Sequence, residues 1–139
     1  MDNSIIINKI ERIRRCIARI ETKCPESVEA LASDLDAQDI VSVNLERAIQ
    51  SSVDIATHII ASMEISAPDT MGEVFVVLQK RDVISSSVAE RMIKSVGFRN
   101  IVVHAYHEID WAVVFAIITK NINDFKDYIR QIAAFCGIE

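Results

Sequence analysis

The chain has 139 residues, the size of one folding domain, and half of them are apolar. Its mean hydropathy of +0.24 is high for a small domain, so we expect an apolar oligomer interface to cover part of the surface. The net charge of −5 argues against a general nucleic-acid binder, and no apolar run is long enough to span a membrane.

The scarce residue types narrow the fold class further. Only 3 glycines and 2 prolines are present, and aromatic residues are few, which favours helices over a β-sandwich or a β-barrel. The three cysteines, Cys16, Cys24 and Cys136, are odd in number and lack the spacing of metal ligands. No signal peptide is recognisable, so we expect free thiols in a reducing cytoplasm.

Charged residues are distributed unevenly along the chain. Residues 25–79 contain ten acidic residues and one basic residue, whereas residues 1–24 and 80–99 are locally basic. The acidic stretch can meet a basic partner, although plain solvation of a charged face is the simpler interpretation.

The first predicted helix covers residues 1–23, because isoleucines recur along it at spacings of four and three. The stripe, which we expect to face a partner helix, consists of Ile6, Ile10, Ile13, Ile17 and Ile20. Arg12, Arg15 and Arg19 follow the same kind of spacing on another face, where they can contact RNA, an acidic partner or solvent, the last being the simplest interpretation. Pro25 ends the helix.

A second long helix is predicted to begin at Asp39, a favourable N-cap residue. Before it, only a short helical turn around residues 28–32 is expected. The apolar stripe of the long helix comprises Leu45, Ile49, Ser52, Ala56, Ile59 and Met63. Asp54 and His58 lie one turn apart beside this stripe and can form a pair. The pair is either a polar edge of the core or a supporting group that faces the functional site.

Two capping boxes predict shorter helices. The pattern Thr-x-x-Glu from Thr70 precedes a largely apolar helix over residues 71–80. The pattern Ser-x-x-Glu from Ser87 precedes a helix over residues 88–96, which we expect to stop at Gly97.

The last predicted helix is long and is weakened in its middle by Asn121 and Asn123. Its apolar stripe comprises Trp111, Val114, Ile118, Ile122, Phe125, Ile129 and Ile132. Together these elements predict a single all-α domain over residues 1–139, an up-and-down bundle of four to five helices.

A polar cluster precedes the last helix, in the segment Arg-Asn-Ile-Val-Val-His-Ala-Tyr from Arg99 to Tyr106. The arginine can hold a phosphate through a planar fork of donors and remains charged. His104 can transfer protons near neutral pH, and the hydroxyl of Tyr106 can bond, or be modified. These side chains suit phosphodiester chemistry.

The spacing of the cluster limits how its residues can meet. On one continuous helix, the five steps from Arg99 to His104 separate the two side chains by about 140° around the axis. Either the backbone bends near residues 97–100, or one site combines side chains of two chains.

The pattern Arg-x4-His-x-Tyr, with Asn100 directly after Arg99, resembles the signature of the HEPN superfamily. With its length and helical architecture, the whole chain is similar to the HepT-like toxins of HepT/MntA toxin–antitoxin pairs. The resemblance implies a cytoplasmic homodimer whose motif residues share one cleft, and an endoribonuclease activity. It also implies a nucleotidyltransferase antitoxin of the MntA type, which neutralises the toxin by adding AMP to Tyr106.

RNA cleavage needs no metal and no cofactor when the 2′-hydroxyl attacks the adjacent phosphate. His104 then suits proton transfer, Arg99 stabilises the charge of the transition state, and Asn100 orients the phosphate. His104, His107 and Glu108 have spacings that could gather them round a metal ion, but no second ligand group accompanies them. We therefore expect no metal site.

Other interpretations remain at this point. His104 can be a histidine that makes a local hydrogen bond, and Tyr106 can be a packed core residue. The alternative function is a non-catalytic helical module that binds a nucleotidyltransferase partner or a nucleotide. The presence of both the arginine and the histidine favours the enzyme.

Overall fold

The computed structural model describes the backbone of residues 2–104 and 109–138, and the side chains of residues 2–100 and 109–138. The elements in chain order are α1 (Ser4–Lys23), α2 (Val28–Ser33), α3 (Leu35–Ser62), α4 (Glu73–Lys80), α5 (Ser86–His104), α6 (Trp111–Ala116), the π-helix η1 (Ile117–Asn121) and α7 (Ile122–Cys136). Every regular element in these residues is helical, which confirms the predicted all-α fold.

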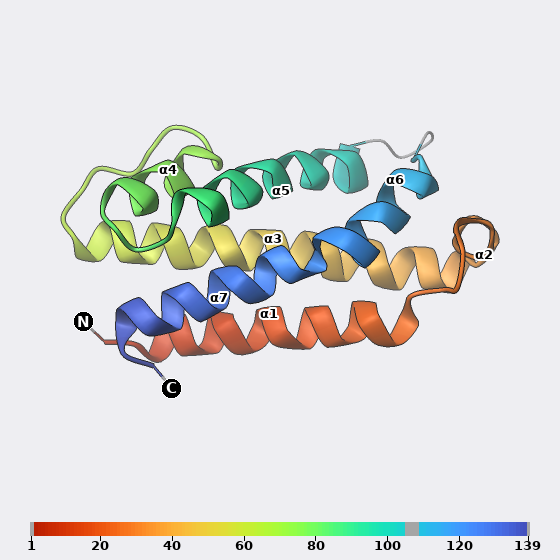
Figure 1. Cartoon of the computed structure of the whole chain (residues 1–139), viewed down its shortest axis with the longest axis horizontal. Helices are drawn as coiled ribbons and strands as arrows, with labels where there is room; N and C mark the ends of the chain where they lie inside the picture. The colour runs from red at the N-terminus through yellow and green to blue at the C-terminus, as the bar shows by residue number, and fades with distance from the viewer. Residues whose placement is uncertain (1, 105–108, 139) are drawn as a thin grey trace.

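The long segments run up and down along one axis (Figure 1). Helix α1 runs away from the end that holds both termini, α3 returns, α5 runs out again, and α6, η1 and α7 return. Asn3 Nδ2 donates a hydrogen bond to the carbonyl oxygen of Cys136 at 2.9 Å, which joins the two ends of the chain. Among the described helices, none is long and apolar enough to cross a membrane.

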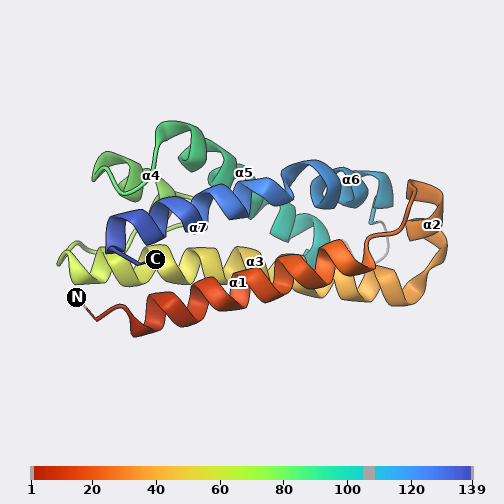
Figure 2. The ribbon, with the colours of Figure 1, turned by 60° about the horizontal axis from the view of Figure 1, so that its bottom comes forward.

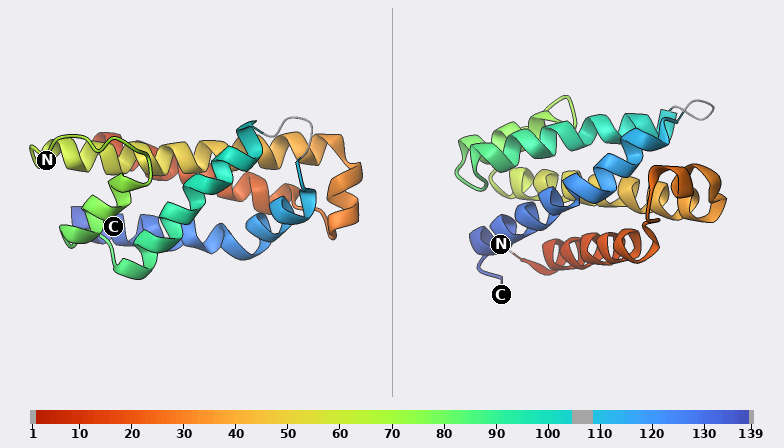
Figure 3. Two further views of the ribbon diagram at one scale, coloured as in Figure 1. Left: turned by 90° about the horizontal axis from the view of Figure 1, so that it is seen from above. Right: turned by 45° about the vertical axis from the view of Figure 1, so that its right-hand side comes forward.

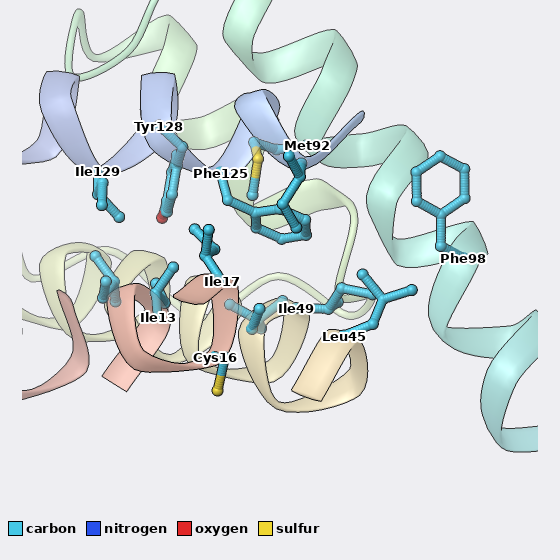
Figure 4. Packing of buried hydrophobic residues seen from close by; sticks show 14 of the residues in the cluster. Ile13, Cys16, Ile17, Leu45, Ile49, Met92, Phe98, Phe125, Tyr128 and Ile129 are labelled. Atoms are coloured by element: carbon cyan, nitrogen blue, oxygen red, sulfur yellow. The ribbon is translucent and has the colours of Figure 1, made fainter. Parts of the chain in front are cut away.

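The core forms where the predicted stripes meet (Figure 4). All five isoleucines of the α1 stripe are buried, and the α3 stripe is buried from Leu45 to Ile59. On α7, Phe125 and Tyr128 are fully buried. The Tyr128 ring packs edge-on against Phe75 of α4 with centroids 5.5 Å apart, and its hydroxyl donates to the carbonyl oxygen of Ser52 at 2.8 Å. Spacing alone therefore predicted the core faces of the long helices.

The predicted starts of α3 and α5 were wrong. Helix α3 begins at Leu35, because the carboxylate of Asp34, and not that of Asp39, accepts the capping bond from the Ala37 amide at 3.0 Å. Helix α5 begins at Ser86, since the hydroxyl of Ser85 accepts from the Val88 amide at 3.2 Å. In both cases a capping residue shortly before the expected one has taken the role.

The capping box predicted at Thr70 lies close to the observed start of α4. Its hydroxyl accepts a hydrogen bond from the Glu73 amide at 3.3 Å, and α4 begins at Glu73, two residues later than expected. A short helix was expected around residues 28–32, and α2 occupies this region with its N-cap at Ser27.

Gly97 does not end a helix, contrary to expectation. Helix α5 continues through it to His104, and residues 101–103 are helical. A side-chain carbon added at Gly97 would meet no atom within 4 Å, so the glycine lies on an open side of the helix. A glycine in a helix interior costs roughly 1 kcal/mol, which buried apolar residues of the same helix such as Met92 and Phe98 can offset.

The long last helix is divided near the expected weak point. Its middle, Ile117–Asn121, winds as a π-helix between α6 and α7, and Asp110 caps α6 by accepting from the Ala112 amide at 3.0 Å. The stripe nevertheless stays inside: its members from Val114 to Ile132 are all buried.

An arginine on α5 joins this helix to α7. Arg91 Nη1 lies 3.1 Å from Asp124 Oδ1 and 2.8 Å from Asp127 Oδ2. The side chain of Asp124 is only 10% exposed, and its second oxygen accepts a hydrogen bond from Asn121 Nδ2 at 3.3 Å. The hydrogen bond from Arg91 holds the pKa of Asp127 below its ordinary value of 3.8.

Replacing Arg91 with methionine should lower the free energy of unfolding by about 1–2 kcal/mol at pH 7, because the nearly buried carboxylate of Asp124 would lose its ion-pair partner and keep only the hydrogen bond from Asn121. A depressed carboxylate pKa stabilises the fold above pH 3.8 and loses that effect as the pH falls further. Urea unfolding at neutral pH and near pH 3 measures both effects. The control Arg130→Met removes the ion pair between the same Asp127 and an arginine side chain that is 74% exposed. It should change the free energy of unfolding little. An equal loss in both variants would contradict the assignment.

Candidate functional site

Helix α5 brings the first half of the polar motif against α3. Figure 3 shows α5 crossing the bundle obliquely, so that its C-terminal end lies beside α3. Phe98 is buried in this region, and Arg99 follows it with its guanidinium Nε 3.4 Å from Glu46 Oε1 of α3. The helix therefore places Arg99 at the edge of the core, next to one carboxylate.

Arg99 and Glu46 form an ion pair that is too long for a strong hydrogen bond. The two side chains are 26% and 31% exposed, and the contact lacks the geometry of a hydrogen bond. Arg99 Nε is buried and forms no hydrogen bond with the side chains that the structure describes. Glu46 thus holds one edge of the guanidinium, and no described residue bonds the terminal nitrogens, which are the atoms that grip a phosphate.

Asn100 is exposed on the next position of α5. One step along a helix turns the side chain by about 100°, so Asn100 and Arg99 project from neighbouring sides. The Asn100 amide can therefore reach a ligand bound at this end of the helix, while Glu46 stays in contact with Arg99.

His104 is the last residue of α5, and its side chain lies outside the described residues, as does all of Tyr106. The backbone stays helical from Ser86 to His104, so the predicted alternative of a bend near residues 97–100 was wrong. Arg99 and His104 therefore lie on one continuous helix, five residues apart.

Asp54 and His58 do not form the expected pair. The oxygens of Asp54 bond Lys9 Nζ of α1 and Gln50 Nε2, each at 3.0 Å. Asp54 thus faces α1, and it lies eight residues, roughly 12 Å along the axis, from the position that meets Arg99.

Glu46 is the carboxylate that sequence reasoning missed. It precedes Arg47 and lies outside the apolar stripe of α3, so no spacing rule distinguishes it from other surface acids. Only the crossing of α5 over α3 identifies its partner. The signal in the sequence is weak: one acid beside the one basic residue of the stretch 25–79.

The metal alternative rests on residues whose side chains are not described. His104, His107 and Glu108 all belong to that part of the chain. Among the described residues, no group of three histidine, cysteine or acidic side chains could hold a metal ion.

The comparisons with known proteins agree with this architecture. Residues 13–132 match the family described as Ribonuclease HepT-like. The mRNA nuclease HepT of Shewanella oneidensis is 34% identical over 132 residues, covering 95% of this chain and 98% of that protein. The tRNA nuclease HepT of Aphanizomenon flos-aquae is 28% identical over 131 residues, covering 94% and 89%.

A solved structure gives the same result in three dimensions. The tri-AMPylated HEPN toxin of Shewanella oneidensis, in complex with its MNT antitoxin, superposes with a TM-score of 0.87 at 34% identity. The match covers 96% of this chain and 99% of that one, so the fold is HEPN-like throughout. By sequence and by fold, the chain belongs to the HepT-like ribonuclease family.

Proposed function

We propose that this protein is the toxin of a toxin–antitoxin pair and acts as a metal-independent endoribonuclease in the cytoplasm. The observation that carries the proposal is the Arg99 guanidinium, held along one edge by Glu46 with no described residue on its terminal nitrogens. Relatives named mRNA nuclease and tRNA nuclease support RNA as the substrate class.

The chemistry follows from three side chains of the motif. The 2′-hydroxyl of RNA attacks the neighbouring phosphorus while His104 accepts its proton, and the resulting His104 imidazolium returns a proton to the departing 5′-oxygen. Arg99 stabilises the extra negative charge of the transition state, where its planar fork fits two phosphate oxygens. Asn100 orients the same phosphate.

A homodimer would resolve the angular separation within one helix. Because α5 is continuous, the helix positions of Arg99 and His104 are about 140° apart around its axis, which does not favour a shared phosphate within one chain. Two chains related by a two-fold axis can place the arginine of one beside the histidine of the other. The active site would then lie at the interface between the copies.

Replacing His104 or Arg99 with alanine should each reduce cleavage of a mixed RNA by about 100-fold or more, since each removes a group that acts in the transition state. Gel analysis in EDTA measures the rate, and the wild type should retain full activity there and leave 2′,3′-cyclic phosphate ends. Asp54→Asn, on the face toward α1, is the control and should cleave normally. Wild-type rates in the His104 variant would refute the mechanism, and an inactive, unmodified wild type would favour the non-catalytic binding module.

Mixing the two inactive variants tests the shared site. If each site takes Arg99 from one chain and His104 from its partner, mixed dimers carry one intact site, so about one quarter of the activity should return. The variants are unfolded and refolded together, and the rate is compared with that of each variant refolded alone. Size-exclusion chromatography with light scattering confirms the dimers, and native mass spectrometry identifies the mixed dimer because the two variant chains differ in mass. No recovery in confirmed mixed dimers would contradict the cross-chain arrangement.

The second part of the proposal concerns inactivation by the antitoxin. We propose that a nucleotidyltransferase of the MntA type transfers AMP from ATP to Tyr106, as the AMPylated state of the relative suggests: the hydroxyl oxygen bonds the α-phosphorus and loses its proton, and pyrophosphate leaves. The chain has two tyrosines, and Tyr128 is fully buried with its hydroxyl bonded to Ser52. Burial also raises the pKa of Tyr128 well above its ordinary value, so this hydroxyl is a poor nucleophile. The phosphate added at Tyr106 would compete with RNA for Arg99.

Tyr106→Phe should lose all tyrosine AMPylation, while Tyr128→Phe should keep it, because the buried hydroxyl is inaccessible to an enzyme. Intact mass after incubation with the cognate antitoxin and ATP gives the readout. An AMP adduct that persists on Tyr106→Phe would move the modification to another residue. The Tyr128 variant also serves as the matched control for the loss of one hydroxyl.

A further inference from the structure

An open groove of about 510 Å³ runs between α1 and α3, the two helices that lie side by side in Figure 2. Arginines line both of its walls: three project from α1 and one from α3, namely Arg12, Arg15, Arg19 and Arg47. The groove is also lined by the thiol of Cys16 and by the amide of Asn44, whose Nδ2 donates to the carbonyl oxygen of Ile40. Asp39 is the single carboxylate in its lining. Four cations and one anion leave the groove strongly positive.

These four arginines differ from most others in the chain. Arg14, Arg91, Arg99 and Arg130 each form an ion pair with a carboxylate. The groove arginines form no ion pair and no hydrogen bond with any residue that the structure describes, and all four are exposed. Of the five arginines in that condition, four therefore gather on one groove and only Arg81 lies elsewhere.

The thiol at the groove shows how closely the charges converge. Cys16 points away from the centre of the core in Figure 4, toward the side where α1 carries its arginines. Burial raises the pKa of this thiol, although Arg12, Arg47 and Arg15 are near enough to act against the rise. The thiol stays neutral and leaves the arginine charges uncompensated.

We propose that this groove binds the phosphodiester backbone of RNA next to the phosphate that is cleaved. The inference rests on the proposed nuclease function and names the surface that holds its substrate. Arginine forks fit phosphate oxygens, and the row from Arg12 to Arg19 is roughly 10 Å long, long enough for more than one phosphate.

The groove is also close to the site around Arg99. Arg47, on the α3 wall, directly follows Glu46, the residue that holds Arg99. The groove and the motif thus flank the same turn of α3, about 100° apart around its axis. A strand lying in the groove can continue over this turn toward Arg99.

The lining residues also indicate how RNA would be recognised. No aromatic side chain lines the groove, so stacking on bases is absent from this part of the described surface. Contacts made by arginines to phosphates carry no base information, and they weaken as counterions compete at high salt. The groove therefore provides affinity that depends on salt and not on sequence.

The test uses a fluorescein-labelled 2′-O-methyl oligouridylate, which lacks the attacking hydroxyl and stays intact during the measurement. Fluorescence anisotropy gives its affinity for the full-length wild type and for Arg12→Gln/Arg15→Gln/Arg19→Gln at several salt concentrations. The matched control Lys80→Gln/Arg81→Gln/Lys120→Gln removes the same charge from exposed positions outside the groove. Arg47→Gln probes the opposite wall without changing α1, and circular dichroism checks the fold of each variant.

We expect the α1 variant to bind at least tenfold more weakly, with a salt slope smaller by about 2, since each phosphate contact contributes about 0.7. Arg47→Gln should weaken binding by a smaller factor, and the control should bind within about twofold of the wild type. If the control and the α1 variant lose RNA affinity equally, binding depends on overall charge and not on the groove, and the proposal is overturned. Normal RNA binding by the α1 variant, with loss of antitoxin binding, would overturn it in favour of a protein interface.

Cleavage of unmodified RNA by the wild type, measured in parallel, separates the two proposals. An inactive wild type whose RNA binding still requires the groove arginines would refute the nuclease and keep the groove. An active wild type whose α1 variant binds RNA normally would refute the groove and keep the nuclease.

Discussion

The packing of the α1 isoleucine stripe along α3 is the contact on which both functional surfaces depend. Because apolar residues of α3 turn toward α1 and the rest of the core, its charged residues are left at the edges of the seam. At one edge Glu46 contacts Arg99 of α5, and at the other Arg47 lines the groove together with the arginines of α1. A change in the register of this seam would therefore disturb Arg99 and the groove together.

The arginines of this chain divide by what holds them. Arg91 contacts two carboxylates at 3.1 and 2.8 Å and is occupied in joining α5 to α7. Arg99 meets one carboxylate at 3.4 Å without a hydrogen bond, which orients the side chain and leaves most of its bonding capacity for a ligand. The groove arginines have no described partner at all. The same residue type is structural, positioned or available according to how many acids surround it.

The sequence predicted the faces of the helices better than their ends, and it did not predict the partners of single charged residues. The stripes of α1 and α3 were correct because burial imposes a strong period, whereas Asp34 and Ser85 took the caps from equally suitable neighbours. Gly97 misled because packing outweighs one unfavourable residue. The partners of Arg99 and Asp54 depend on how helices cross, which no local pattern contains.

Net charge is a poor guide to this protein's capacity to bind RNA. Exposed charges farther apart than about 8 Å are largely screened at physiological ionic strength, so acids on distant helices contribute little to the field within the groove. The four arginines between α1 and α3 act at contact distance, and one carboxylate opposes them there. An overall charge of −5 is thus compatible with a local anion site, and the acidic remainder limits where RNA can bind. The charge distribution would direct a strand into the groove by excluding it from most of the other surface.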